Sequence, residues 1–532
     1  MALKTFAAID VGSFELAMKI FEISPRAGLR EIDDIRHRID LGTDTYTTGK
    51  ISNERINELC EVLKEFKEIM RTYKVNAYRA YATSALRETE NRLIILDMIK
   101  NRTGLDIEVL SNSEQRFLDY KAIASKGEGF QKIIEKGTAI VDIGGGSVQI
   151  SLFDNDSLIT TQNIRLGVLR MRERILSMQV KPSQYEKLIE EIVDNQLEIL
   201  KKMYFKDRVI DNIIVVDDYL SPVMQNPAVC AGGGYMTRED CIALAGQLQG
   251  KNKAEIAKKL GISEEKVFLL FNSVVLMKRV IECMNAKLLW APGVTLCDGM
   301  VYEYAEGNRL ISPEHDFEKD ILACVANISK RYMGSKKRSE SVENIALTIF
   351  DSMKKIHGLG KRERLLLQIA AKLYDCGKYI SMTSVGECSY SIIMATEIIG
   401  LSHLEREMVA NIVKYNRIDF PYYHENGEQL GMDLVSYLKV AKLTAILKLS
   451  NGLDRSHKQK FKTIKATLHE QEQELVLSVD TAADITLEKG LIKPKAQFFE
   501  EVYSIRPVIR QKRNYGKCPV QNRHLCSWGS GA

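Results

Sequence analysis

The chain has 532 residues, enough for three or four domains, and its 75 Lys and Arg against 70 Asp and Glu give a net charge of +5. With 45% hydrophobic and 27% charged residues, it is not mainly disordered, and no apolar run of about 18 residues predicts a membrane helix. Lys4 and Asp10 interrupt the first apolar stretch, and no small-residue cleavage pattern follows it. We therefore expect a cytoplasmic protein with no signal peptide and no membrane partner.

The ten cysteines are scattered and include no Cys-x-x-Cys pattern, which argues against a disulfide scaffold. Near the C-terminus, Cys518, His524 and Cys526 offer three potential metal ligands without a fourth, so an unstructured end is the simpler interpretation. Basic residues between Arg506 and Lys517 form a local run, which is usually a solvated face or tail. We expect no nucleic-acid partner.

The first 300 residues alternate predicted strands with predicted helices. Strands are predicted where β-rich apolar runs occur, and helices where apolar residues recur at helical spacing. The predicted strands are Thr5–Asp10, Ala17–Ile23, Thr138–Asp142, Val148–Phe153, Leu158–Ile164, Asn212–Val216 and Ala228–Cys230, and the predicted helices lie within Ile51–Tyr73 and Leu188–Leu200.

A weak internal duplication is visible in this part of the chain. One strand ends in Asp10-Val-Gly-Ser13 and a later one ends in Asp142-Ile-Gly-Gly-Gly-Ser147, and each is followed directly by another strand. Two α/β halves that each open with such a hairpin would face each other across a cleft.

From about Ser312 the sequence predicts one helix after another, and a mixed stretch follows. The predicted helices are Val342–His357, Lys361–Leu373, Tyr390–Ile399, His403–Tyr415 and Leu434–Leu449, and the mixed stretch Thr463–Tyr503 has a strand at Glu474–Val479 and a helix at its end. The expected domains are residues 1–125, 126–305, 306–462 and 463–510, with a basic tail at 511–532.

The segment from Asp142 to Ser147 carries the clearest chemical signal. Successive glycines (Gly144, Gly145, Gly146) let backbone N–H groups point into one concavity, and the Ser147 hydroxyl adds a donor, as phosphate binding requires. Asp142, like Asp10 before Ser13, suits a hydrated Mg²⁺, which prefers one or two carboxylates plus phosphate oxygens. A plain glycine-rich hairpin is the alternative, but pairing with the Asp10 loop and with the loop containing Gly233 favours phosphate.

These segments resemble the exopolyphosphatase/guanosine pentaphosphate phosphatase (Ppx/GppA) family. The matching stretches are Ala7-Ala-Ile-Asp-Val-Gly-Ser13, Ala82-Thr-Ser-Ala-Leu-Arg-Glu88 with Asn91, Ile107-Glu-Val-Leu-Ser111, Val141-Asp-Ile-Gly-Gly-Gly-Ser147, Leu166-Gly-Val168 and Gly293-Val-Thr-Leu-Cys-Asp-Gly299. The resemblance implies an α/β fold with two actin-like, ribonuclease-H-like domains around a cleft. An all-α HD-like domain and a small α+β domain would follow them.

The resemblance also implies an activity and its parts. The activity is hydrolysis of a terminal phosphate on inorganic polyphosphate or guanosine pentaphosphate, with Mg²⁺ held by Asp142 and Asp10. Arg87 matches the family's phosphate-binding arginine, and its guanidinium fork suits that task. Ser13, the three glycines, Ser147 and Gly233 would complete the phosphate contacts. A homodimer is possible by family analogy.

The departures from the family put catalysis in question. Gln115 stands where the family has its general-base Glu, and Gln149 stands where the family has another carboxylate. A neutral amide can hold a water molecule but cannot take its proton. Glu114 lies one residue away, but Ser111-x-x-Glu114 is a capping-box pattern that already explains it. The alternatives are therefore a hydrolase of reduced activity, in which Gln115 and Gln149 position water, or a non-catalytic protein that binds polyphosphate or guanosine tetraphosphate.

The helical region resembles an HD-type domain that has lost its metal ligands. Only Asp375 of the His, His-Asp, His, Asp series remains, because Tyr374 replaces the paired His and Ser341 and Asn416 occupy other ligand positions. One carboxylate does not make a metal site, so we expect no metal and no phosphodiesterase activity in this region.

Overall fold

The computed structural model describes residues 4–24, 28–205, 208–227, 229–230, 232–249, 252–313, 315–423, 431–461 and 463–512. The chain forms two compact units, of which the first comprises residues 1–328 and 396–406 and the second comprises residues 329–395 and 407–532. In the described part of the chain, no helix is long and apolar enough to cross a membrane.

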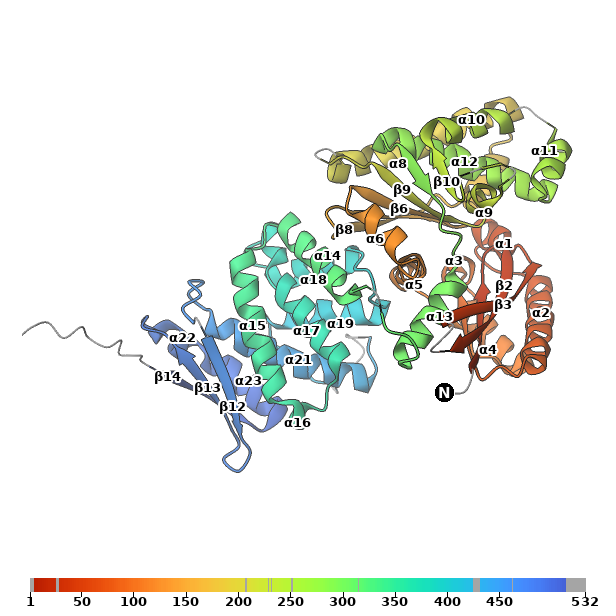
Figure 1. Ribbon diagram of the computed structural model, residues 1–532. Coiled ribbons are helices and arrows are strands. Elements are labelled where there is room, and N and C mark those ends of the chain that lie inside the picture. The colour runs from red at the N-terminus through yellow and green to blue at the C-terminus, as the bar shows by residue number, and fades with distance from the viewer. Residues whose placement is uncertain are drawn as a thin grey trace, which may run out of the picture. The chain divides into compact units, whose positions relative to one another are not determined.

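The first unit opens with a five-stranded sheet of order β3-β2-β1-β4-β5. Figure 1 labels its strands β2 and β3, with helix α2 beside them. Strand β1 alternates faces: Ala7, Ile9 and Val11 share one core with helix α2, whereas Phe6 and Ala8 share another with helix α13. Helices therefore cover both faces of the sheet. The elements are β1 (Lys4–Val11), β2 (Glu15–Ser24), β3 (Gly28–Arg38), α1 (Leu41–Thr48), α2 (Asn53–Thr72), β4 (Ala77–Ala82), α3 (Ser84–Glu88), α4 (Arg92–Thr103), β5 (Glu108–Val109), α5 (Asn112–Ala124) and α6 (Glu128–Ile134).

A second sheet repeats this topology. Its order is β10-β11-β9-β6-β7-β8; β6, β7 and β8 pair antiparallel, as β1, β2 and β3 do, and β9 adds in parallel to β6, as β4 adds to β1. The elements are β6 (Thr138–Ile143), β7 (Val148–Phe153), β8 (Leu158–Ile164), α7 (Val168–Ser177), η1 (Pro182–Gln184), α8 (Tyr185–Leu200), η2 (Lys201–Phe205), β9 (Asn212–Asp217), α9 (Leu220–Gln225), β10 (Tyr235–Thr237), α10 (Arg238–Leu248), α11 (Lys253–Leu260), α12 (Glu264–Met284), β11 (Leu288–Trp290), α13 (Leu296–Gly307) and α14 (Phe317–Arg331).

This repetition confirms the predicted duplication and the actin-like fold of two ribonuclease-H-like halves. Helix α13 returns from the second half to pack on α5 and β1 of the first. Gly299 makes this approach possible, because a Cβ there would lie 2.1 Å from the carbonyl oxygen of Leu118 on α5. The last turns of the second half thus fix the position of α5.

The second unit is helical and carries a three-stranded sheet of order β12-β13-β14. Asp433 caps the long helix α21 by accepting from the amides of Val435 and Ser436, and α21 packs on α15, α17 and α23. The elements are α15 (Lys336–Ser352), α16 (Lys354–His357), α17 (Lys361–Leu373), η3 (Cys376–Tyr379), α18 (Val385–Ala395), α19 (His403–Tyr415), α21 (Leu434–Leu453), β12 (Thr463–His469), β13 (Glu474–Asp480), α22 (Thr486–Leu491), α23 (Lys493–Tyr503) and β14 (Arg506–Lys512).

Most predicted elements are present. The strand predicted at 228–230 is wrong, because Val229 and Cys230 do not lie in a strand. The sequence did not predict β3, β4, β5, β10, β11, β12 or β14, and β14 falls partly in the predicted basic tail. Cys518, His524 and Cys526 lie outside the described residues. The division into two units does not resolve the finer boundaries near 125, 306 and 462, which stay predictions, as does the likeness of the helical region to HD domains.

Candidate active site

A cavity of about 90 Å³ lies between the two halves of the first unit. It is lined by the β1–β2 turn, by α5, by the loop after β6 and by the end of β9, and the start of α13 closes it. The predicted residues Asp10, Ser13, Gln115, Asp142, Gly144 and Gly145 all line it. The structure therefore brings together residues that are up to 135 positions apart in the sequence.

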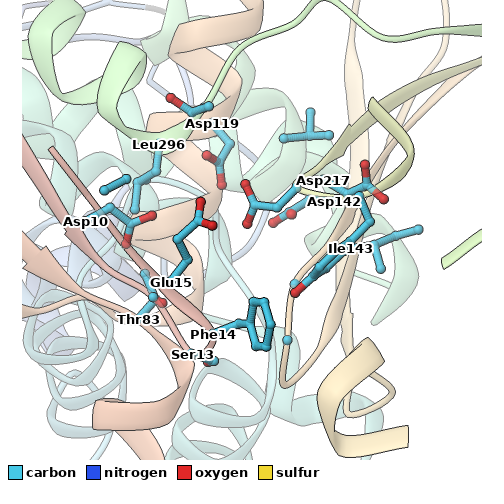
Figure 2. A pocket seen from close by; sticks show the side chains of 18 of the residues that line it. Asp10, Ser13, Phe14, Glu15, Thr83, Asp119, Asp142, Ile143, Asp217 and Leu296 are labelled. Atoms are coloured by element: carbon cyan, nitrogen blue, oxygen red, sulfur yellow. The ribbon is translucent and has the colours of Figure 1, made fainter. Parts of the chain in front are cut away.

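Carboxylates dominate the lining. Asp10 comes from β1, Glu15 from β2, Asp119 from α5, Asp142 from β6 and Asp217 from β9, and Figure 2 shows these five side chains around one space. Arg36 and Lys266 also line the cavity, but both form ion pairs with Glu15. The cavity therefore has more acidic groups than its cations neutralise.

Burial raises the pKa of the aspartates that line the cavity. It raises the pKa of Asp10 to about 8 and of Asp142 to about 7, and it raises the pKa of Asp119 well above its usual range, with repulsion from Asp142 and Asp10 adding to the effect. The buried guanidinium of Arg116 acts in the opposite direction on Asp142. Oδ1 of Asp10 and Oδ2 of Asp142 are buried without a hydrogen-bond partner.

These unpartnered oxygens fit a divalent cation. Mg²⁺ prefers oxygen ligands and is usually held by one or two carboxylates, with waters and phosphate oxygens completing its shell. A bound cation would also favour the charged forms of these acids, whose pKa values burial and then mutual repulsion raise. Asp10 and Asp142 are the residues of this cavity that could hold it.

The glycine loop after β6 leaves donors available. The loop closes through a hydrogen bond from the Gly144 amide to the Ser147 carbonyl oxygen (2.9 Å), and Ser147 is buried. Within the described residues, the amides of Gly145 and Gly146 donate no hydrogen bond. They are therefore available to an anion. Gly146 packs so closely on Tyr46 that a Cβ would lie 2.4 Å from its hydroxyl.

Ser13 and Arg87 lie beside the cavity with their donors partly engaged. The Ser13 hydroxyl forms a buried trio with the hydroxyls of Tyr46 (3.0 Å) and Ser84 (2.9 Å). One guanidinium nitrogen of Arg87 donates to the Leu110 carbonyl (2.8 Å) and to the Gln115 amide oxygen (3.3 Å). Arg87 is thus next to Gln115, although it does not itself line the cavity.

Glu114 and Gln115, the two candidates for the general-base position, lie in different environments. Glu114 accepts from the Ser111 amide (2.9 Å), while the Ser111 hydroxyl accepts from the Glu114 amide, which is the predicted capping box. Gln115, in contrast, lines the cavity. Glu114 is occupied in starting α5 and is absent from the cavity lining.

Gln149 has a different environment from Gln115. It is 3% exposed, its amide oxygen accepts from Nε of Arg116 (2.8 Å), and it does not line the cavity. A buried guanidinium therefore holds the Gln149 amide away from the cavity. Gly233 also lies away from the cavity, at an exposed turn before β10 with φ of +60°.

Sequence reasoning missed Asp119. The residue is 5% exposed and lines the cavity with Gln115, four positions earlier on α5. The available signal was this spacing, because residues i and i+4 of a helix lie on the same face.

In the second unit, Asp375 has cationic neighbours. Its carboxylate accepts hydrogen bonds from Arg338 (2.6 Å), Lys378 (2.9 Å) and Arg417. These donors occupy the oxygens that a metal would need, and among the described residues no group of three His, Cys, Asp or Glu side chains could hold a metal ion.

Family sequence models match both the α/β part and the helical part of the chain. The sequence model of the Ppx/GppA phosphatase family matches residues 20–307, and that of Ppx/GppA phosphatase, domain III, matches residues 322–493.

Curated relatives and solved structures agree with this match. A guanosine-5'-triphosphate,3'-diphosphate pyrophosphatase of Vibrio atlanticus is 21% identical over 91% of this chain and 95% of its own, and one of Photobacterium profundum is 19% identical over 83% and 86%. The crystal structure of an exopolyphosphatase from Cytophaga hutchinsonii is 19% identical, with a TM-score of 0.50 over 58% of this chain and all of its own. At this identity, the structural likeness shows the fold.

Proposed function

The chain belongs to the Ppx/GppA phosphatase family, and from this premise we propose that it releases terminal phosphate from a phosphoanhydride chain at the cavity of the first unit. The observation that carries this proposal is the pair of buried, unpartnered carboxylate oxygens on Asp10 and Asp142, next to a glycine loop with free amides. A site built only to bind a polyanion would have little use for so many carboxylates, because they repel it.

Each part of the cavity has a chemical task in this proposal. The amides of Gly145 and Gly146 and the Ser13 hydroxyl would hold the oxygens of the terminal phosphate, and Arg87 would add charge at its edge. Asp10 and Asp142 would hold Mg²⁺, which supplies positive charge to the phosphate oxygens when bound. Gln115 would hold the attacking water by hydrogen bonding.

The substrate class follows from the cavity and from the relatives. The described lining contains no aromatic shelf for a base apart from Phe14 and Tyr219, and its donors suit phosphate oxygens. We propose inorganic polyphosphate as the first substrate to test. Guanosine pentaphosphate is the second, because the curated relatives are named for that nucleotide.

Phosphate release from purified protein tests the proposal. We expect release from polyphosphate or guanosine pentaphosphate that depends on Mg²⁺, is abolished by excess chelator and returns when Mg²⁺ is restored. Tight, salt-dependent binding of polyphosphate without any release would favour the non-catalytic binding protein instead. Release that chelator does not affect would contradict the role of Asp10 and Asp142.

A further inference from the structure

Helix α5 presents two polar side chains to the cavity. Gln115 and Asp119 are four residues apart, so they lie on the same face about 6 Å apart along the helix axis. Side chains in a helix tilt toward its N-terminus, which inclines Asp119 toward Gln115. A carboxylate therefore lies one helical turn from the position that holds the base in the family.

Contacts on its other faces hold α5 in place. Arg116 donates to Gln149 and to Thr161 of the second half, and Tyr120 donates to Asp320. The backbone of Leu118, next to Asp119, meets Gly299 of α13 with no room for a Cβ. Asp119 is therefore presented from a rigid element.

The other carboxylates of the cavity have other tasks. Glu15 pairs with Lys266 and Arg36, and Asp217 accepts from the amides of Leu220 and Ser221 and from the Ser273 hydroxyl. These two acids are therefore occupied by protein donors.

Of the remaining acids, Asp10 and Asp142 carry the unpartnered oxygens that fit a cation. Asp218 also lines the cavity, but it is an exposed residue after β9, whereas Asp119 is buried. Among the described residues, the Asp119 carboxylate has neither a hydrogen bond nor an ion pair, although the residue is 95% buried. It is left free to act on a molecule in the cavity.

We propose that Asp119 is the general base of this chain and takes over the task that Gln115 cannot perform. This inference rests on the proposed function. As the water oxygen bonds to the terminal phosphorus, one water proton passes to the Asp119 carboxylate. The bond from that phosphorus to its bridging oxygen breaks, and the electron pair stays on the shortened chain. The proton then passes from Asp119 to solvent.

Removing the carboxylate at position 119, and then introducing one at position 115, tests the inference. Asp119→Asn is nearly isosteric and should lower kcat for phosphate release by about 10²–10⁴-fold, the usual contribution of a general base. Adding Gln115→Glu to Asp119→Asn restores the number of carboxylates and should recover at least about tenfold of the loss. Asp106→Asn makes the same change at an exposed site in the same half and should be silent.

The Mg²⁺ concentration for half-maximal rate separates a base from a metal ligand. It should be unchanged in Asp119→Asn. A large rise in this Mg²⁺ concentration, together with a kcat that Gln115→Glu does not recover, would overturn the inference and favour a role for Asp119 as a metal ligand.

Two other results would also overturn the inference but leave the proposed function standing. They are full activity of Asp119→Asn, and an inactive parent that Gln115→Glu alone makes active. If the parent, Gln115→Glu and the double variant all fail to release phosphate, the proposed function is wrong, and the inference fails with it.

Discussion

Two aspartates, Asp142 in the first unit and Asp375 in the second, carry the same chemical group in opposite environments. Asp142 is buried with one oxygen unpartnered, and burial raises its pKa to about 7. Asp375 accepts hydrogen bonds from Arg338, Lys378 and Arg417. Among the described residues, no cation donates a hydrogen bond to the first carboxylate, whereas three donate to the second.

The charge around each group explains the difference. The cavity of the first unit gathers acids from five elements, so a bound cation would relieve their repulsion. Around Asp375, cations outnumber acids even when Asp454, 4.0 Å from Arg338, is included. A surviving acid in a family motif can thus be a binding group in one place and a structural counter-ion in another.

Asp375→Asn should give the largest effect on stability. It leaves three partly buried cations without their anion, so we expect the free energy of unfolding to fall by about 3 kcal/mol. Chemical denaturation measures this. Asp351→Asn is the matched control, because Asp351 pairs with Arg364 and Lys354 but is 37% exposed, and its removal should cost less than about 1 kcal/mol. Equal effects of the two substitutions would contradict the structural role of Asp375.

A smaller effect on stability is expected for Lys495, whose surroundings show the excess of cations in the second unit. Burial, and then the charges of Arg417 and other cations, lower its pKa to about 7. Above pH 7 the unfolded chain therefore binds a proton that the folded chain has released, so this group adds stability as the pH rises from about 7 toward 10.

Lys495→Met should remove that dependence. The variant should be more stable than the parent by about 2 kcal/mol at pH 7, and the difference should shrink at pH 9. Lys493→Met, at an exposed position of the same helix, should change stability by less than about 0.5 kcal/mol. A difference between Lys495→Met and the parent that does not change with pH would show that Lys495 stays charged when folded.

Much of the fold could be predicted because its strands and helices have clear periodicity. Strand β3 was missed because its sequence is mostly charged, with Arg30, Glu31, Asp33 and Asp34 in succession along a sheet edge, where charges are usual. Strand β14 was missed for the same reason, since Arg506 and Arg510 give it the composition of a basic tail.

The part of the candidate site that lies at strand ends and in the glycine loop could be predicted from the sequence. The glycine loop, Asp10 and Asp142 stand at strand ends in patterns that suggest phosphate and metal. Asp119 could not be identified in this way, because an acid inside a helix usually lies on a solvated face. The spacing of four from Gln115 puts Asp119 on the same helix face, but whether that face borders a cavity depends on how α13 packs against α5 through Gly299.

The most direct test of whether the two aspartates differ as described is the Mg²⁺ affinity of the whole chain, measured by calorimetric titration in the presence of orthophosphate. We predict a site that Asp142→Asn weakens by at least about tenfold and that Asp375→Asn leaves unchanged while the protein is folded. Unchanged Mg²⁺ affinity in Asp142→Asn, or its loss in folded Asp375→Asn, would contradict the account.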